Sequence, residues 1–398
     1  MKHTPLIAFF KPFDYFYLNP TTRLYHEMLE ATPGVVTVSL DNYADLSLSR
    51  ASPDVVVFTP FVFLGKSREI FADTISRLKR AYDVPLLPLV TFEQCERYLQ
   101  AFLEMRARSP SSVALMTEYD LHAMNEEDDA ISLGQRETDY FLLSGPELYD
   151  FDLHVRGNIS KTNFNHDLNA DSVRIGYDFI VAKKHQTISL PHVIATQEFY
   201  LSSAIGHGAK SRRISVPGAS YAPRRAAVSE VVSQYPREIV LHLIDKIAYR
   251  AGRVIPNTSL RQQFLNGYYQ KLITASRISF TCGSTSGYFV RKFIEIPAFG
   301  SCLCTFNYSF LAHLGLRPDI HYLPVETVNE IGVYIEKLND PEFMQHVIDC
   351  TIAAHNQILK CHSVYARHKQ LGDTLQLIIQ GRFSGSYWDN GEYKYRDT

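Results

Sequence analysis

The sequence predicts an α/β protein with two domains, each built on a parallel β-sheet flanked by helices. Two observations predict this fold class. The chain has 398 residues, which is more than one hydrophobic core usually supports. Short apolar runs also alternate with amphipathic helical patterns in two separate blocks, and such alternation is typical of parallel sheets covered on both faces. We therefore expect two Rossmann-like domains in tandem.

The N-terminal domain is expected over residues 1–192. Apolar runs predict strands at 6–10, 35–40, 54–58, 85–90, 112–116 and 139–144. Apolar residues spaced three and four apart predict helices at 21–31, 67–82 and 92–107. The alternation is lost over 150–192, where polar and β-rich pieces indicate an irregular β excursion before the second domain.

The C-terminal domain is expected over residues 193–380. Strands are predicted at 212–218, 238–244, 277–282 and 301–306. Helices are predicted at 195–205, 259–276, 286–296, 328–340, 341–362 and 363–379. Residues 381–398 form a polar tail with several tyrosines and the single tryptophan, and we expect this tail to pack back on the N-terminal domain.

The composition excludes several classes of protein. Hydrophobic residues make up 45% and charged residues 21%, an ordinary soluble balance rather than a disordered one. The net charge of −2 is not that of an electrostatic nucleic-acid binder, so any anion site must be local. The apolar stretches near the N-terminus and over 296–316 are interrupted by polar or helix-breaking residues, and they predict neither a signal peptide nor a spanning helix. We expect a cytoplasmic protein, with peripheral attachment to the inner face of the membrane left open.

The six cysteines show no CxxC spacing and are too sparse for a disulfide scaffold, so reduced thiols are expected. Cys302 and Cys304 lie two apart on a predicted strand, so their side chains point to the same side. We interpret both as core residues, because no His or Cys partner has the spacing of a metal site.

The segment FTCGSTSGYFVRKFIEIPAFGSCLCTF, residues 280–306, carries the strongest candidate site. A strand ends in a small polar turn, and a helix that starts there would present backbone N–H groups and the hydroxyls of Ser284 and Thr285 to a phosphate. The turn matches neither GxGxxG nor GxxxxGK[ST], so the dinucleotide and P-loop fingerprints do not apply.

The helix predicted after this turn carries charges suited to a nucleotide. Tyr288, Lys292 and Glu295 share one face at helical spacing. A carboxylate at position 295 could accept from ribose hydroxyls, and Arg291 or Lys292 could neutralise a diphosphate. The alternative is a surface ion pair between Arg291 and Glu295, which lie one helical turn apart.

Three ordered segments resemble the C-terminal half of the CgeB-like, group 1 glycosyltransferases. They are YYQKLITASRISFTCGSTSGYFVRKFIEIPAFGSCLCTF, then LGLRPDIHYLPV, then HNQILKCHSVYARHKQL. VPGASYAPR, residues 216–224, also resembles the PG-x-x-Y-x-x-R turn of that family. The resemblance covers residues 239–372, and it implies a GT-B architecture in which two Rossmann-like domains face each other and the C-terminal one holds a nucleotide-sugar donor.

The resemblance also implies roles for individual residues. Glu295 would hold the ribose, and Ser284, Thr285 and Tyr288 would line the diphosphate. One departure matters: retaining members of the wider superfamily have a second Glu eight residues before the ribose Glu, and this chain has Gly287 there. The stereochemical outcome is therefore left open.

Further candidate residues come from the remaining charges. Residues 210–225 hold five cations and no acid, Arg224 among them, and form either a local anion site or a solvated patch. Lys246, Arg250 and Arg253 follow the predicted strand at 238–244, where a C-terminal-domain strand would deliver diphosphate ligands. His207, in a GHG sequence, could donate to a phosphate or sugar oxygen, with a structural role as the alternative.

The N-terminal domain is expected to receive the acceptor. Asp14 lies among four aromatic residues after the first strand, where aromatic faces would stack on a sugar and a carboxylate could deprotonate a hydroxyl. Asp120 and His122 are the other candidate base pair. An ordinary loop is the alternative in both places.

Together these observations predict a glycosyltransferase of surface polysaccharide or glycoconjugate synthesis. It would transfer a sugar from a UDP-, GDP-, TDP- or CMP-linked donor to a glycan or lipid-linked acceptor. No cofactor and no metal are expected, because cationic side chains and helix starts would stabilise the leaving phosphate. The alternatives are a catalytically silent nucleotide- or sugar-binding protein, a sugar-nucleotide epimerase and a phosphorylase on the same two-domain plan.

Overall fold

The computed structural model describes the C-terminal half of the chain almost continuously and the N-terminal half in pieces. The described residues are 7–11, 20–39, 55–58, 86–88, 141–143, 184–195, 198, 210–218, 222–256, 258–283 and 289–397. The predicted helices at 67–82 and 92–107, the predicted strand at 112–116 and most of the predicted helix at 195–205 lie outside them.

The N-terminal part contains a parallel sheet of four strands in the order β2-β1-β3-β4. Its strands are β1 (Ile7–Lys11), β2 (Val35–Ser39), β3 (Val55–Phe58) and β4 (Leu86–Pro88). Helix α1 (Pro20–Glu30) connects β1 to β2. Two further strands, β5 (Phe141–Leu143) and β6 (Thr187–Ser189), pair in parallel, and the 3-10 turn η6 (Lys184–Gln186) precedes β6.

The C-terminal part contains a second parallel sheet of four strands, in the order β10-β9-β8-β7. Its strands are β7 (Arg212–Ser215), β8 (Ser276–Phe280), β9 (Cys302–Phe306) and β10 (Leu323–Val325). Cys302 and Cys304 are buried in the core between this sheet and its helices, as predicted. The predicted α/β fold class, with parallel sheets flanked by helices, is confirmed.

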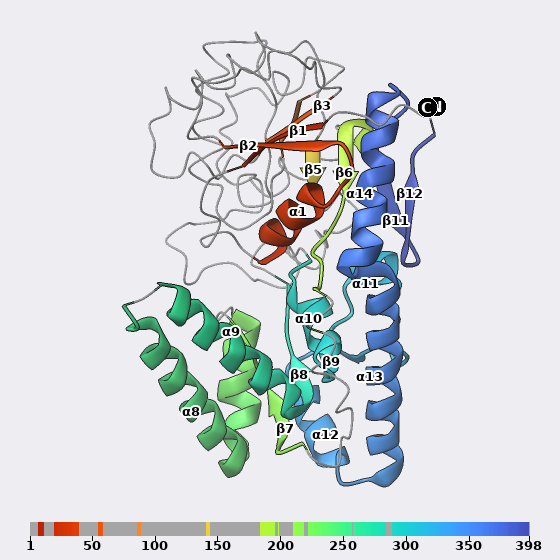
Figure 1. The fold of residues 1–398 in the computed structure, drawn as a ribbon. Helices are drawn as coiled ribbons and strands as arrows, with labels where there is room; N and C mark the ends of the chain where they lie inside the picture. Colours follow the sequence, from red (N-terminus) through yellow and green to blue (C-terminus); the bar gives the residue numbers. More distant parts are fainter. Residues whose placement is uncertain are drawn as a thin grey trace, which may run out of the picture.

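Helices cover this sheet and extend beyond it (Figure 1). They are α7 (Ala222–Ala226), η9 (Ala227–Val231), η10 (Val232–Gln234), α8 (Pro236–Arg253), α9 (Thr258–Thr274), α10 (Lys292–Ala298), α11 (Ser309–His313), α12 (Glu330–Lys337), α13 (Pro341–His362) and α14 (Val364–Ile379). Asp340 caps α13 by accepting from the backbone of Glu342, and Ser363 caps α14 by accepting from Ala366.

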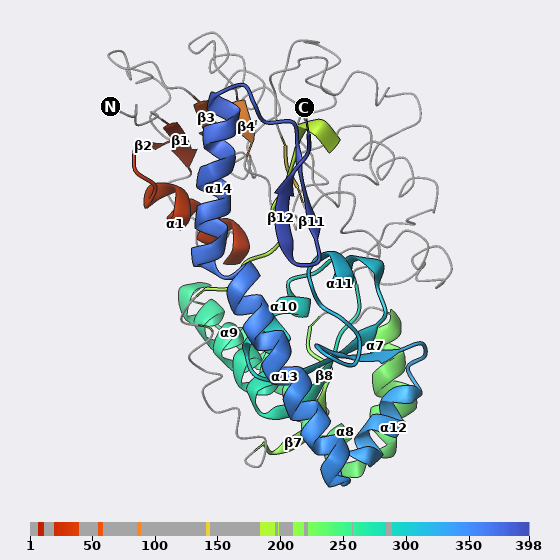
Figure 2. The same cartoon turned by 90° about the vertical axis from the view of Figure 1, so that its right-hand side faces the viewer.

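The chain returns from the second sheet to the first through α14 and a C-terminal hairpin (Figures 1 and 2). Helix α14 packs with α1 around a buried apolar cluster that includes Tyr25 and Leu371. The hairpin of β11 (Ser386–Asp389) and β12 (Glu392–Tyr395) lies beside β6, where the indole N–H of Trp388 donates to the Ser189 carbonyl over 2.7 Å. The expected domain boundaries stay a prediction.

The predicted strand at 238–244 is wrong, because these residues lie inside the 18-residue helix α8. Pro236 stands at the first helical position, where its fixed φ favours a helix start. The apolar run was interpreted as a buried strand, yet Val240, Leu243 and Ile244 are exposed. A short apolar run cannot separate strand from helix by periodicity alone, and here its residues face outward.

The predicted helix at 286–296 begins later and ends later than expected. Helix α10 starts at Lys292 and runs to Ala298, so Pro297 lies within its last turn and does not end it. Gly300, with a φ of 74°, lets the chain leave the helix toward β9. The first turn of α10 therefore does not arise from the Ser/Gly turn, and a phosphate site built on that helix start is not supported.

Candidate functional site

A cavity of about 1290 Å³ opens beside the carboxyl end of β7 in the C-terminal sheet. Its wall comes from residues 216–218, which follow β7, and from α7, α8, α9 and α10. Leu24 of α1 and the segment around His192 border the same cavity, so both parts of the molecule contribute. Ligands bind beyond the carboxyl ends of strands in open parallel sheets, which makes this cavity the candidate site.

Positive charge dominates the lining of the cavity. Its cations are Arg224, Arg225, Lys246, Arg250, Arg253, Arg261, Arg291 and Lys292, and its carboxylates are Glu198, Asp245 and Glu295. The whole chain carries a net charge of −2, so this excess of cations is local. Such a wall favours an anionic ligand.

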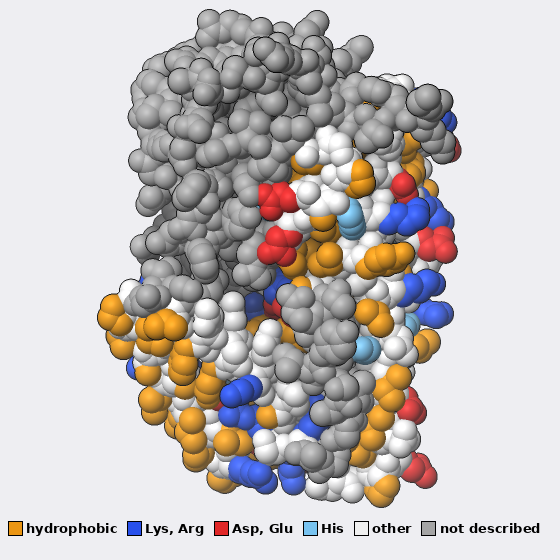
Figure 3. All heavy atoms as spheres, in the orientation of Figure 1, with side chains coloured by type: hydrophobic (Ala, Val, Ile, Leu, Met, Phe, Trp, Pro, Cys, Tyr) orange, Lys and Arg blue, Asp and Glu red, His pale blue; other side chains and the backbone are white. Residues whose placement is uncertain are grey.

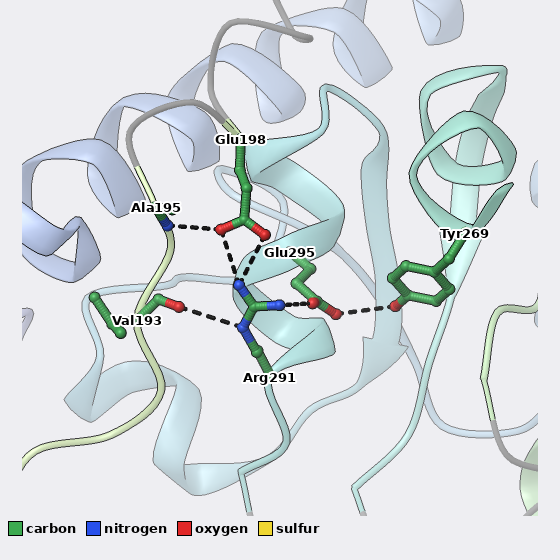
Figure 4. A network of polar contacts seen from close by, with 6 residues as sticks. All are labelled: Val193, Ala195, Glu198, Tyr269, Arg291 and Glu295. Atoms are coloured by element: carbon green, nitrogen blue, oxygen red, sulfur yellow. Dashed lines mark hydrogen bonds and ion pairs between the residues drawn. The ribbon is translucent and has the colours of Figure 1, made fainter. Parts of the chain in front are cut away.

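Arg291 is the centre of a polar network at the edge of the cavity (Figure 4). Its guanidinium bonds both carboxylate oxygens of Glu198, at 2.9 and 2.8 Å, and forms an ion pair with Glu295 one turn along the chain. It also donates to the carbonyl of Val193 over 3.3 Å. Burial alone would lower the pKa of Arg291, but Glu295 and Glu198 offset this and raise it above its ordinary value. Arg291 is therefore a fixed cation held between two carboxylates.

Glu295 accepts from two directions inside this network. One carboxylate oxygen accepts from the guanidinium of Arg291. The other accepts from the hydroxyl of Tyr269 of α9 over 3.0 Å. The expected pair of Arg291 and Glu295 thus forms, but Glu295 is only 7% exposed, so it is not a surface pair. Burial, and then the Glu295 charge, hold the pKa of Tyr269 well above its ordinary value, so its hydroxyl stays a donor. Each carboxylate oxygen has two lone pairs, which leaves acceptor capacity for a ligand.

Gly218 allows the cation Lys292 to approach the turn after β7. Its φ of 98° lies in the left-handed region, and a Cβ there would collide with the Lys292 side chain. Arg224 approaches the same side of this turn and is 2% exposed. Its guanidinium donates to the Thr281 hydroxyl and the Cys282 carbonyl, both at 2.9 Å, and so links α7 to the loop after β8.

The basic segment at 210–225 divides into two groups. Lys210 donates to the carbonyls of Thr274, Ser276 and Gly300, Arg212 forms a bidentate pair with Asp245, and Arg213 donates to Asn339. Arg224 and Arg225 line the cavity. The first group therefore holds secondary structure together, and only the second belongs to the candidate anion site.

Lys246 and Arg250 line the cavity, although they project from a helix and do not follow a strand, and their role as diphosphate ligands stays a prediction. Within the part of the chain that the structure describes, neither makes a hydrogen bond or an ion pair. The remaining predicted site residues, Asp14, Asp120, His122, His207, Ser284, Thr285 and Tyr288, lie outside the described residues.

The polar residues of the cavity wall that sequence reasoning missed include His192, Glu198, Asp245 and Tyr269. Burial, and then the nearby charges of Arg291 and Lys292, lower the pKa of His192 to about 3, so its imidazole is neutral at ordinary pH. No spacing in the sequence links these residues to Glu295, because 93 residues separate Glu198 from Arg291.

Comparisons with known proteins give a weak structural likeness. No family model matches the chain, and no curated protein matches it in sequence. HepE from Anabaena, solved with UDP, has a TM-score of 0.46 and 9% identity over 93% of this chain and 99% of that one. A glycosyltransferase from Rickettsia africae has a TM-score of 0.44 and 11% identity over 95% of this chain and 100% of that one. A putative UDP-N-acetylglucosamine 2-epimerase from Listeria monocytogenes has a TM-score of 0.43 and 10% identity over 95% of this chain and 98% of that one.

These scores and identities are low, so the functional argument rests on the residues of this chain. The resemblance to CgeB-like glycosyltransferases stays a prediction. Among the described residues, no helix combines the length and the apolar character that a membrane crossing requires.

Proposed function

We propose that the protein is a GT-B glycosyltransferase that transfers a sugar from a nucleotide-sugar donor. One observation carries the proposal: a large cavity beside the carboxyl end of β7 combines Lys246 and Arg250 with the buried carboxylate of Glu295. Cationic side chains can neutralise a diphosphate, and a carboxylate held in a fixed position can accept hydrogen bonds from ribose hydroxyls. The resemblance of residues 239–372 to CgeB-like glycosyltransferases supports the same assignment.

The charges around the cavity suggest how the reaction would proceed. Lys246 and Arg250 would neutralise the diphosphate and stabilise the negative charge that develops on the leaving nucleotide, which is the work a metal ion does in other enzymes. Glu295 would accept from the ribose. Arg291, held by Glu198 and Glu295, would position Glu295 rather than bind the diphosphate. We therefore propose a metal-independent enzyme.

The acceptor would enter from the N-terminal part of the molecule, which borders the cavity through Leu24. Asp14, and Asp120 with His122, are the candidate bases that the sequence provides, and His207 is a candidate donor to a phosphate or sugar oxygen. A glycan or lipid-linked acceptor of surface polysaccharide or glycoconjugate synthesis fits this proposal.

Calorimetric titration with UDP, GDP, TDP and CMP tests the donor assignment. We expect one nucleotide to bind, to raise the unfolding temperature, and to bind equally well after EDTA treatment. If none of the four binds, the proposal is wrong. If binding is lost with EDTA, the metal-independent mechanism is wrong while the donor assignment stands.

A catalytically silent nucleotide-binding protein is the second candidate. The observation that favours it is Gly287, eight residues before Glu295, where retaining relatives in the resembled superfamily have a Glu. Hydrolysis or transfer of the sugar from the bound donor, measured by nucleotide release above background, would exclude a silent protein.

A further inference from the structure

The hairpin of α8 and α9 exposes an unusual amount of apolar surface. Val240, Leu243, Ile244 and Ile247 of α8 are between 49% and 67% exposed. Their spacing of three and four residues places them on one face of the helix. The stripe continues at the tip of the hairpin and the start of α9, and we call the whole set the outer face: Val240, Leu243, Ile244, Ile247, Val254, Leu260 and Phe264.

Figure 3 shows hydrophobic side chains gathered over α8 and α9 at the lower left of the molecule. Apart from Tyr249 of α8, the other large apolar residues that are exposed in the described part of the chain lie on separate elements, for example Val333 on α12 and Ile352 on α13. Single exposed apolar residues are ordinary, whereas a stripe of them at helical spacing marks a surface that binds a partner.

The charges beside the outer face are all positive. Arg237, Lys246, Arg250 and Arg253 of α8 are exposed. The only carboxylates of α8 are Glu238, which is 4% exposed, and Asp245, which pairs with Arg212. Helix α9 contains no Asp or Glu. The hairpin therefore presents apolar side chains and cations without an exposed, unpaired carboxylate in the residues that the structure describes.

We infer that the outer face docks on an anionic lipid surface. A helix that lies in a membrane interface buries Leu, Ile and Val among the acyl chains while Lys and Arg contact anionic head groups.

A second copy of the chain fits this surface less well. If two copies met through the outer face about a twofold axis, the same patch of each would oppose the other. The cations of the two α8 helices would then approach each other, and like charges that face each other across an interface are unfavourable. An anionic membrane removes that repulsion and gains from the same cations.

The lipid surface would lie near the candidate site, because Lys246, Arg250 and Arg253 of the same helix line the cavity. Docking would therefore bring the cavity to the membrane surface, where a lipid-linked substrate is presented. The inference rests on the exposure and charge of α8 and α9 and does not depend on the proposed nucleotide chemistry.

Vesicle flotation tests this inference with the full chain. The probes are vesicles of phosphatidylcholine alone and vesicles that also contain phosphatidylglycerol. We expect the protein to float with the anionic vesicles and to be released as the salt concentration rises, because salt screens the cationic contribution. The double variant Ile244→Gln, Ile247→Gln should bind the anionic vesicles with an affinity at least about tenfold lower. The reason is that two apolar side chains that would be partly buried in the lipid are lost from the contact.

The control is Ile352→Gln, Leu359→Gln on α13, where both residues are also exposed but not on the outer face. It should bind the vesicles like the wild type, and both variants should keep the unfolding temperature. Three results would overturn the inference: absence of binding to anionic vesicles, equal binding by the outer-face variant, or a stable dimer in solution that this variant dissociates. The last result would assign the outer face to a second copy.

Discussion

Helices α8 and α10 border the same cavity but distribute their side chains in opposite ways. In α10 every residue from Phe293 to Ala298 is buried, including the carboxylate of Glu295. In α8 the aliphatic residues around Ile244 face outward, and so do the cations Lys246 and Arg250. The carboxylate of α10 is paired inside the protein, whereas the cations and aliphatic side chains of α8 are exposed and can contact binding partners. Changes in α10 should therefore alter stability, and changes in α8 should alter binding.

The largest expected effect is at Arg291, which holds α10 in place. Arg291→Ala would leave the carboxylates of Glu198 and Glu295 without their shared cation in a buried network. Removing one partner of a buried ion pair costs about 3–5 kcal/mol of unfolding free energy. Urea unfolding followed by circular dichroism measures this loss. Arg291→Lys is the control and should lose less, because it keeps the charge but not the bidentate contact.

If Arg291→Ala lowers the unfolding free energy by less than about 1 kcal/mol, Arg291 does not hold α10 through a buried network. A loss of that size is typical of a solvated surface ion pair. The distinction between a buried α10 and an exposed α8 would then fail at its central residue.

Much of the fold follows from the sequence because strands of a parallel sheet are buried on both faces. The apolar runs at β7, β8 and β9 identified those strands to within a few residues. The run in α8 has the same composition but is not buried, so the rule that connects apolar runs to strands failed there. The start of α10 was missed because the small polar turn was interpreted as a cap, while the helix begins at Lys292.

The site was less predictable than the fold. Spacing suggested that Arg291 and Glu295 would meet, and they do. It could not indicate that Glu198 and Tyr269 complete their network, because those contacts join segments brought together only by tertiary packing. Lys246 and Arg250 were chosen for a wrong reason, the end of a strand that is absent, yet they line the cavity.

The next effect tests α8 as a binding element. The double variant Lys246→Gln, Arg250→Gln should weaken nucleotide binding by about 1–3 kcal/mol, the range for hydrogen bonds to charged groups. Its unfolding free energy should change by less than about 0.5 kcal/mol, as for other surface substitutions. Calorimetric titration with the nucleotide that the wild type binds gives the first quantity, and urea unfolding gives the second.

Lys360→Gln, an exposed lysine on α13 that does not line the cavity, is the matched control and should leave affinity unchanged. An unaltered affinity in the double variant would remove α8 from the proposed donor site, while a large loss of stability would show that these cations support the fold.

The smallest expected effect is at Tyr269, whose hydroxyl completes the α10 network. Tyr269→Phe removes one donor to Glu295, at 3.0 Å, and leaves the ion pair with Arg291 intact. The cost should be about 0.5–1.5 kcal/mol of unfolding free energy, the net value of one hydrogen bond. Because the pKa of Tyr269 is raised well above its ordinary value, the hydroxyl stays protonated and the cost should be constant between about pH 7 and pH 9.

Tyr268→Phe is the matched control on the same helix, since its hydroxyl donates to Asp245 over 2.6 Å outside the Arg291 network. In a double-mutant cycle, Tyr269→Phe should couple to Arg291→Ala, because both groups bind the same carboxylate, while Tyr268→Phe should be additive with it. Additivity of Tyr269→Phe would mean that the hydroxyl does not support Glu295, and the network would then end at the ion pair. Coupling confined to Tyr269 would show that α10 is stabilised as one unit, in contrast to the independent cations of α8.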